Sequence, residues 1–386
     1  SDRVGTPTTH DHIYPGTGAP NATVALAGPA EMNLAVSAAV DAQRQWISLT
    51  VDQRRDALIG LADVVREHLG ELADLNTRDY GVPISYAGNA IMLEQFLRHF
   101  AGYVDKPHGS STPVSGSADV NLIEREPYGV VGLIYPWNGP LFNACAKVAP
   151  ALAAGCSSVV KPAEETPLTA VLLERLIAEA GVPEGVANFV IGYGATAGAA
   201  ITAHPDVEKV AFTGSTEVGK EIMRGSADNL KKVTLELGGK SPVLIYEDAD
   251  LDMAIMMASM GIFVHSGQGC VCGSRVFVQR SVYERVVAGI SMIGENLVLG
   301  GPRDEGAMIS PLVSAKQLDR VMGYIEQGKR DGVEIVSGGY RVDRKGYFVK
   351  PTVVTNVDPA TSRLYREEIF GPVVTILPFD DDDEAV

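Results

Sequence analysis

A thiol and a carboxylate in two glycine-containing segments of this chain could together carry out covalent catalysis. Cys270 lies in Gly-Gln-Gly-Cys-Val-Cys-Gly-Ser-Arg (267–275), and Glu236 lies upstream in Leu-Glu-Leu-Gly-Gly-Lys-Ser-Pro (235–242). A thiol can attack a carbonyl carbon, and a carboxylate can activate the water that releases the product. No other cysteine lies between the two residues. We therefore interpret Cys270 as the candidate nucleophile and Glu236 as its general base.

The glycines around Cys270 bear on this interpretation. The alternative is a buried, inert thiol, because most cysteines are of that kind. Gly267, Gly269 and Gly273 instead favour a backbone that is exposed to a ligand. Cys272 is either a packing thiol or a reserve partner for an oxidised Cys270, and packing is the favoured interpretation.

Two further segments place polar groups after expected strands. Pro136-Trp-Asn-Gly-Pro140 offers the Asn138 amide, a suitable donor to a developing oxyanion, although such a segment is more often a turn. Lys161 and Glu164, in Lys-Pro-Ala-Glu-Glu-Thr-Pro, can hydrogen-bond sugar hydroxyls, and Glu164 would repel a ribose phosphate. The alternative for this pair is an exposed couple of loop charges.

Glycines in two other loops could approach a nucleotide. Gly214-Ser-Thr-Glu-Val-Gly219 follows an expected strand and opens a helix, where a phosphate can meet backbone N–H groups. The segment lacks the Gly-x-Gly-x-x-Gly spacing of many dinucleotide sites, and a plain tight turn is the alternative. In Ile191-Gly-Tyr-Gly, Gly192 and Gly194 could lie against a flat ring.

The elements that must position these residues alternate between apolar runs and amphipathic segments. This alternation predicts a parallel sheet with helical crossovers, whose ligands bind beyond the carboxyl ends of the strands. The expected buried strands are Val130–Tyr135, Ser157–Lys161, Ala187–Ile191, Lys209–Thr213 and Lys232–Leu237. The expected helices between and around them are Glu31–Trp46, Val51–Leu75, Pro167–Ala180 and Thr216–Gly225.

A second unit is expected after Gly238, with a helix at Leu251–Met260, a strand at Arg275–Gln279 and a helix at Ser281–Leu299. Val120–Arg125 alternates apolar and polar residues, as a half-exposed strand does.

Composition excludes several classes of protein. The chain has 386 residues, of which 46% are apolar and 21% charged, so a core of two or three domains is expected. The net charge of −16 argues against nucleic acid or an anionic membrane as a partner. The four cysteines match no zinc or disulfide framework, and no apolar stretch is long enough to span a bilayer. We expect a cytoplasmic protein without a metal site.

The segments taken together resemble the NAD(P)-dependent aldehyde dehydrogenase superfamily. Six motifs occur in the family's order, and the resemblance runs from about residue 30 to the end. They are Pro-Trp-Asn-x-Pro, Lys-Pro-x-Glu, Phe-Thr-Gly-Ser-Thr-x-x-Gly, Leu-Glu-Leu-Gly-Gly-Lys, Gly-Gln-x-Cys and Glu-Glu-Ile-Phe-Gly-Pro-Val (367–373).

The resemblance implies a catalytic role for four residues. Cys270 would form a thiohemiacetal with the aldehyde, and Asn138 with the Cys270 backbone N–H would stabilise the oxyanion. Glu236 would activate the water that hydrolyses the resulting thioester. Lys147 resembles the lysine that supports proton release.

The resemblance also implies a set of cofactor contacts. Lys161 and Glu164 would bind the adenine ribose of NAD, with NADP as a possible second cofactor, and Gln317 is a weaker match for the same ribose. The remaining expected contacts are Gly194 at the adenine, Trp137 and Ser215 at the pyrophosphate, and Glu368 and Phe370 at the nicotinamide end, with Gly214 and Leu237 as further cofactor-binding residues.

Two departures from the family bear on the substrate. Gly139 replaces an aromatic side chain and Ala146 replaces a tryptophan of several relatives, which predicts a wide tunnel for a bulky aromatic, terpenoid or long-chain aldehyde. Asn143, Val264 and Val271 are expected to line the same tunnel.

The implied fold is α/β: a Rossmann-type parallel-sheet cofactor domain, an α/β catalytic domain and an oligomerisation hairpin. The expected bounds are 1–117 and 129–237 for the NAD-binding domain, 118–128 for the hairpin and 238–386 for the catalytic domain. The family's carboxyl-terminal part, including its last oligomerisation strand, is missing from the sequence. A homodimer or homotetramer is expected.

Other functions compete with aldehyde oxidation. A CoA-acylating aldehyde dehydrogenase characteristically lacks the water-activating glutamate, so Glu236 argues against it. A cysteine hydrolase or protease would need a histidine partner, and only His265 is near Cys270 in the sequence. A structural relative without activity is disfavoured by the presence of Cys270, Glu236 and Asn138 together.

The choice of nucleophile can be tested by replacing each thiol in turn. Cys270→Ala should abolish aldehyde-dependent NADH formation and ester hydrolysis while NAD binding stays measurable, because only the attacking sulfur is removed. Cys272→Ala is the matched control and should keep most of its rate. A comparable collapse in the control would show that Cys272 is the nucleophile.

Overall fold

The computed structural model describes residues 8–86 and 89–386, which divide into two compact units. The first unit contains residues 8–10, 23–75 and 89–236, and the second contains 11–22, 76–86 and 237–386. Each unit is therefore built from segments that are separated in the sequence. Two strands near the amino terminus, β1 (Thr8–Tyr14) and β2 (Ala19–Leu26), form a two-stranded sheet.

A five-stranded sheet forms the centre of the first unit. Its strand order is β7-β6-β5-β8-β9, and β5 pairs in parallel with both β6 and β8. Because β5 comes first in the chain and lies in the middle, the chain winds outward in both directions from it, as in a doubly wound fold. The strands are β5 (Val130–Ile134), β6 (Ser157–Lys161), β7 (Ala187–Phe189), β8 (Lys209–Gly214) and β9 (Lys232–Leu237).

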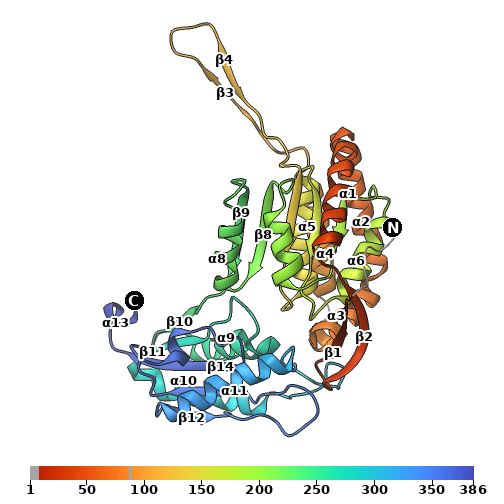
Figure 1. Ribbon diagram of the computed structural model, residues 1–386. Coiled ribbons are helices and arrows are strands. Elements are labelled where there is room, and N and C mark those ends of the chain that lie inside the picture. The colour runs from red at the N-terminus through yellow and green to blue at the C-terminus, as the bar shows by residue number, and fades with distance from the viewer. Residues whose placement is uncertain (1–7, 87–88) are drawn as a thin grey trace. The chain divides into compact units, whose positions relative to one another are not determined.

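Helices of the first unit pack on this sheet around an apolar core (Figure 1). Trp46 is fully buried in that core, and its indole N–H donates to the Leu152 carbonyl. The helices are α1 (Pro29–Ser48), α2 (Val51–Glu67), α4 (Asn89–Ala101), α5 (Pro140–Ala153), α6 (Leu168–Glu179), α7 (Ala199–Ala203) and α8 (Thr216–Gly225). Helix α3 (Leu69–Tyr80) begins in the first unit and ends in the second.

Local sequence explains where several of these helices begin. Thr50 caps α2 through a reciprocal pair of hydrogen bonds with Gln53, at 3.2 and 2.9 Å. Ser215 caps α8 by accepting from the Val218 N–H. The helix predicted over Val51–Leu75 is divided at His68, shortly before Gly70, a poor helix former.

The predicted parallel sheet is confirmed, but the expected burial of its two edge strands is wrong. The strand predicted over Ala187–Ile191 ends at Phe189 as β7 and is half-buried throughout. β9 was expected to be buried, whereas its residues alternate between exposed and half-buried. The reason is its place in the strand order, because β9 lies at the edge of the sheet and has only β8 as a neighbour. An edge strand need not be apolar on both faces.

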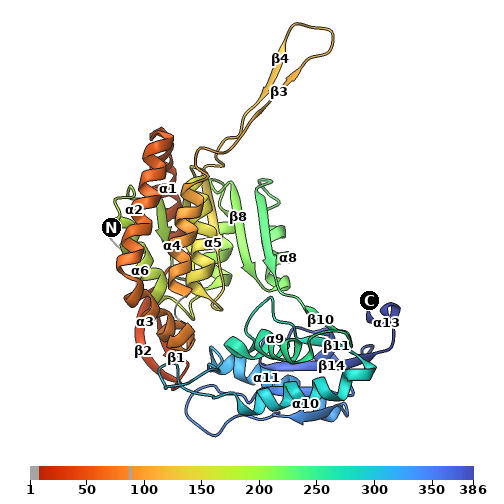
Figure 2. The same cartoon turned by 180° about the vertical axis from the view of Figure 1, so that it is seen from behind.

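A hairpin extends from the first unit, and its strands do not pack against the core of that unit. β3 (Ser110–Pro113) and β4 (Val120–Ile123) pair antiparallel, and every residue in both strands is exposed. Figure 1 and Figure 2 both show the hairpin pointing away from the sheet. Val120, Leu122 and Ile123 are 60%, 67% and 52% exposed, so the hairpin leaves apolar surface uncovered.

The second unit contains a mixed five-stranded sheet in the order β10-β11-β14-β13-β12. All neighbours are parallel except β12, which runs antiparallel to β13. The strands are β10 (Pro242–Ile245), β11 (Arg275–Gln279), β12 (Glu334–Ser337), β13 (Thr352–Thr355) and β14 (Val373–Phe379). The helices are α9 (Leu251–Phe263), α10 (Tyr283–Asn296), α11 (Ala315–Arg330), α12 (Arg363–Arg366) and α13 (Asp382–Ala385).

Two apolar clusters fill the second unit. One lies among α9, α10 and strands β11 and β14, and the other lies beneath α11. Within the described ranges, no helix combines the length and apolar character needed to cross a bilayer.

Candidate active site

Cys270 lies in a turn between α9 and β11, and it is the exposed thiol among the four cysteines. Cys145 and Cys156 are buried, and Cys272 is intermediate. The turn containing Cys270 is closed by a hydrogen bond from the Cys272 N–H to the Gly269 carbonyl at 3.1 Å. Cys270 is thus held on a short, defined turn with its side chain accessible to solvent.

Gln268 anchors the segment that leads into this turn. It is almost fully buried, and its amide N–H₂ donates to the carbonyls of His265 and Pro311 while its oxygen accepts from the Val313 N–H at 2.9 Å. Such a buried amide with partners on both sides fixes the backbone on which Cys270 stands. The Gln of the Gly-Gln-x-Cys motif therefore has a structural task that the sequence does not reveal.

The backbone just before Gln268 adopts unusual conformations. His265 and Ser266 both have φ of 54°, in the left-handed region that non-glycine residues rarely enter. The Ser266 hydroxyl donates to the Ser310 carbonyl, and the His265 ring stacks on Tyr80 at 6.0 Å between centroids. Burial lowers the pKa of His265. Strained backbone conformations of this kind persist where surrounding contacts hold the chain in place, and they often occur near functional sites.

Packing also requires glycine at two of the three positions around Cys270. Gly267 has φ of 67°, and a Cβ there would overlap the Gly371 carbonyl oxygen. A Cβ at Gly273 would overlap the Val243 side chain, and one at Gly269 would lie 3.0 Å from the Cys272 sulfur. Neighbouring protein atoms therefore leave no room for a side chain at position 267 or 273.

Three sequence motifs meet in one cavity of the second unit. Its lining includes Gly239 from Leu-Glu-Leu-Gly-Gly-Lys, Gly267 and Gly269 from the cysteine segment, and Glu368 and Phe370 from Glu-Glu-Ile-Phe-Gly. The Glu368 carboxylate accepts from the Gly239 N–H at 3.2 Å. Burial raises the pKa of Glu368, and the nearby charges of Arg320 and Lys240 oppose that effect.

Cys272 lines the same cavity as a packed thiol. Burial raises its pKa to about 11, so the thiol is protonated at neutral pH. A protonated sulfur is a poor nucleophile, because the thiolate is the reactive form. This agrees with the packing role that the sequence favoured for Cys272.

Lys240 is a buried cation of this region that sequence reasoning missed. Burial, together with the charge of Arg275, lowers its pKa to about 8, and Glu368 acts in the opposite direction. Its Nζ is buried and has no hydrogen-bond partner within the described residues. Lys240 ends the Leu-Glu-Leu-Gly-Gly-Lys motif, so the sequence marks its position, but its burial arises from tertiary packing.

The first unit places its expected catalytic groups at the carboxyl ends of two strands. Trp137, Asn138 and Gly139 form the half-buried loop between β5 and α5, and Glu236 is exposed near the end of β9. Lys147 is buried on α5, and burial lowers its pKa to about 8 while the Glu236 charge raises it. An amine with this pKa is partly neutral near physiological pH and can exchange a proton there.

Five tunnel-wall predictions concern this loop, α5 and the residues on either side of Cys270. Asn143 is buried and its amide donates to the Gly139 carbonyl at 3.0 Å, so it holds the start of α5. Ala146 is half-buried, as is Val264, and Val271 is 84% exposed beside Cys270. Gly139 has φ of 136°, which an aromatic side chain at that position would not readily adopt.

Phe142 is an aromatic residue of α5 that sequence reasoning missed. It is 44% exposed, and its ring meets Phe96 of α4 edge-on at 5.9 Å between centroids. The signal was present in the spacing, because residues 139, 142, 143 and 146 recur on one helix face.

The expected adenosine contacts gather in the first unit. Lys161 is buried at the end of β6, with its amine donating to the Pro162 carbonyl at 2.6 Å and to Glu164 at 3.4 Å. Burial lowers the pKa of Lys161, and Glu164 opposes this. Its burial excludes the alternative of an exposed pair of loop charges.

The two glycines of the Ile191-Gly-Tyr-Gly loop have different structural surroundings. A Cβ at Gly192 would lie 2.5 Å from the Ala27 carbonyl oxygen, so packing requires that glycine. Gly194 opens a π-helical turn, η2 (Gly194–Gly198), and no atom would lie within 4 Å of a Cβ there. Gly194 therefore leaves open space, as a flat ring against the backbone would need.

The Gly214 loop has the features of an anion-binding turn. Gly214 ends β8, exposed Ser215 caps α8, and the first N–H groups of the helix face outward from there. Leu237 follows as a half-buried residue at the end of β9. Within the described residues, no group of three or more His, Cys, Asp or Glu side chains is arranged to hold a metal ion.

Comparison with known proteins identifies the family. A model of the aldehyde dehydrogenase family matches residues 4–386. The chain belongs to the aldehyde dehydrogenase family. It is 44% identical to an aldehyde dehydrogenase of Enchytraeus buchholzi over 380 residues, which is 97% of this chain and 76% of that protein. A putative aldehyde dehydrogenase of Bacillus subtilis is also 44% identical, over 98% of this chain and 77% of its own length.

Solved structures of the family agree with this assignment. The NAD⁺ complex of an aldehyde dehydrogenase from Bacillus cereus is 46% identical, with a TM-score of 0.95 over 98% of this chain and 77% of that one. A betaine aldehyde dehydrogenase from Staphylococcus aureus is 36% identical, with a TM-score of 0.95 over 98% of this chain and 78% of that one. The predicted family, fold class and enzyme class are confirmed, and NAD is confirmed as a cofactor at the level of the family.

The contribution of Gly267 to the stability of the fold can be measured by substitution. Gly267→Ala should lower the free energy of unfolding by about 3 kcal/mol, because it combines a left-handed backbone with overlap against Gly371. Gly332→Ala is the matched control, since Gly332 has φ of 82° and open space around it, and should cost about 1 kcal/mol. Urea unfolding of both variants provides the comparison. Equal losses would contradict the overlap with Gly371.

Proposed function

We propose that this aldehyde dehydrogenase oxidises an aldehyde to a carboxylic acid with NAD, by way of a covalent intermediate on Cys270. The observation that carries the proposal is the exposed thiol of Cys270 on an anchored turn beside the cavity lined by Gly239, Glu368 and Phe370. The Cys270 sulfur adds to the aldehyde carbonyl and forms a thiohemiacetal. NAD, when bound, accepts the hydride that this carbon loses, and a thioester remains on the protein.

Thioester hydrolysis requires a base and a place for the released protons. Glu236 is assigned as the base that takes a proton from water, since its carboxylate is exposed at the end of β9. Asn138 is assigned as an oxyanion donor together with the Cys270 N–H. Lys147, with a pKa of about 8 and within the electrostatic influence of Glu236, is assigned to proton release.

The cofactor is assigned to two groups of residues. Lys161, Glu164 and Gly194 suit an adenosine, and Gly214 and Ser215 suit a pyrophosphate at the start of α8, with Trp137 and Leu237 at neighbouring strand ends. Glu368 and Phe370 are assigned to the nicotinamide ribose and ring. Glu164 favours NAD over NADP, because its carboxylate repels a 2′-phosphate.

The substrate is proposed to be a bulky aromatic, terpenoid or long-chain aldehyde. Gly139 and Ala146 leave room on the tunnel side of α5, and Val264 and Val271 add small apolar groups near Cys270. Phe142 contributes an exposed aromatic surface, supported edge-on by Phe96. Aromatic contacts of this kind favour a flat aldehyde by about 1 kcal/mol beyond the area buried.

The remaining assignments concern assembly and location. A homodimer or homotetramer is supported by the uncovered apolar residues of the β3–β4 hairpin, which covers part of the interval 118–128 assigned to oligomerisation. The assignment of 1–117 with 129–237 to cofactor binding and of 238–386 to catalysis belongs to the same proposal, as does a cytoplasmic location.

Aldehyde-dependent formation of NADH tests the proposed reaction. Absorbance at the NADH band should rise when aldehyde and NAD are present, without any need for CoA, and NADP should be used less efficiently. A strict requirement for CoA would replace hydrolysis with acyl transfer, and failure to form NADH from any of a panel of aldehydes would refute the proposal. Size exclusion with light scattering tests the assembly.

Replacing the general base should separate the two chemical steps. Glu236→Gln should retain the first turnover but slow the steady state, because an amide cannot take a proton from water. Stopped-flow traces should show a burst of NADH followed by a slow phase reduced at least about 100-fold. Glu221→Gln, an exposed residue farther along α8, is a charge-matched control and should leave both phases intact. Unchanged deacylation in Glu236→Gln would assign the base to another group.

The size preference can be tested on α5. Phe142→Ala should raise KM for benzaldehyde about tenfold and leave acetaldehyde within twofold, because only the larger substrate reaches the ring. Tyr103→Ala removes another exposed aromatic of the same cluster and serves as the control. A wild type that prefers acetaldehyde, or equal losses for both substrates in Phe142→Ala, would contradict the bulky-aldehyde proposal.

A further inference from the structure

The loop 367–371 has a backbone that must be held in place. It follows α12 and carries Glu368 and Phe370, and Phe370 has φ of 61°. A bulky side chain in the left-handed region costs about 1–3 kcal/mol, so neighbouring contacts must offset that strain. The structure shows which element supplies those contacts.

Helix α11 binds three successive carbonyls of this loop. The Arg320 guanidinium donates to the Glu368 carbonyl at 2.7 Å and to the Ile369 carbonyl at 3.4 Å, and the Gln317 amide donates to the Phe370 carbonyl at 2.8 Å. Val321 packs so closely on Gly371 that a Cβ there would overlap it. One face of one helix therefore fixes the loop from residue 368 to 371.

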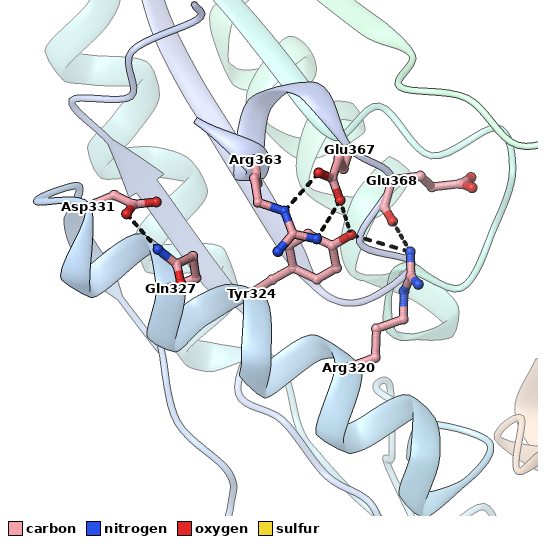
Figure 3. A network of polar contacts seen from close by, with 7 residues as sticks. All are labelled: Arg320, Tyr324, Gln327, Asp331, Arg363, Glu367 and Glu368. Carbon is pink, nitrogen blue, oxygen red and sulfur yellow. Dashed lines mark hydrogen bonds and ion pairs between the residues drawn. The ribbon is translucent and has the colours of Figure 1, made fainter. Parts of the chain in front are cut away.

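Arg320 is itself held by a network that starts at Glu367 (Figure 3). Tyr324 donates to the Glu367 carboxylate at 2.6 Å, and Arg363 donates to the same carboxylate through two bonds at 2.7 and 2.8 Å. The guanidinium groups of Arg320 and Arg363 lie 5.3 and 5.1 Å from the centre of the Tyr324 ring. The hydrogen bonds from Arg363 and Tyr324 lower the pKa of Glu367 to about 2, so it stays ionised.

The position of the Glu368 carboxylate depends on this backbone. Its carboxylate accepts from the Gly239 N–H, and a Cβ at Gly238 would overlap it. The backbone at Gly238 and Gly239 thus restricts the position of the carboxylate. A shift of the 368 backbone would move it out of that position, because both ends of the residue are constrained.

We propose that Arg320, supported by Tyr324 and Gln317, is a positioning residue that fixes Glu368 and Phe370 for the nicotinamide ribose half of NAD. This inference rests on the proposed function, in which Glu368 contacts that ribose. Arg320 acts through the carbonyls of Glu368 and Ile369. Its contribution is therefore confined to the nicotinamide half and leaves the adenosine half unaffected.

Binding of NAD and of ADP by the full chain separates these two halves. ADP carries the adenosine and pyrophosphate but lacks the nicotinamide ribose. Arg320→Met should raise Kd and KM for NAD about tenfold while Kd for ADP stays within twofold, because only the loop carbonyls lose their donors. Tyr324→Phe keeps the ring under both guanidinium groups, removes the bond to Glu367, and should weaken NAD binding about threefold, again without affecting ADP.

Lys329→Met is the matched control on the same helix. Lys329 pairs with Glu326 and donates to the Gly339 carbonyl, so its loss removes an equal charge elsewhere on α11 and should change neither affinity. Equal weakening of NAD and ADP, or no change for NAD in both Arg320→Met and Tyr324→Phe, overturns the positioning role. A wild type that binds no NAD overturns the proposed function as well, so the two failures are distinguishable.

Discussion

The second unit depends on the close approach of three loops that only glycine allows. Gly238 leaves room for the Glu368 carboxylate, and Gly267 leaves room for the Gly371 carbonyl. Any side chain at 238 or 267 would separate the loops and open the cavity that they line. Interiors pack at crystal-like density, so such a separation would spread to neighbouring elements. The geometry beside Cys270 is thus a property of backbone contacts between segments far apart in the sequence.

The first unit buries two amines among the residues assigned to its site. Lys147 and Lys161 are 9% and 3% exposed, and burial lowers the pKa of each. Lys161 is stabilised by the Pro162 carbonyl and by Glu164, whereas Lys147 is under the influence of the Glu236 charge. Burying an ammonium is unfavourable unless it is compensated, so these positions carry a cost to the fold. That cost is consistent with sites where a ligand or a proton is handled.

The periodicity of apolar residues predicted those helices and strands that are determined by their local sequence. The strands Ser157–Lys161 and Arg275–Gln279 and the helix Thr216–Gly225 have the predicted bounds. The exposure of β9 could not be predicted, because it follows from strand order and not from the residues of the strand. The same holds for the role of Gln268 and for the burial of Lys240, which depend on residues distant in sequence. Phe142 was missed for a different reason, since its helical spacing relative to the expected tunnel residues was visible in the sequence but was not used.

The contrast between the glycines and Cys270 bears on whether this chain is a silent relative or an enzyme. A protein that kept only the fold would still need Gly238 and Gly267, because their contacts are structural. Cys270 is different: its thiol is exposed, so packing does not explain a sulfur at that position. Cys272, two residues away, is a partly buried, packed thiol, and burial raises its pKa to about 11. An exposed thiol on a turn fixed by Gln268 is therefore better explained by reaction chemistry than by stability, and this favours the catalytic reading of the site.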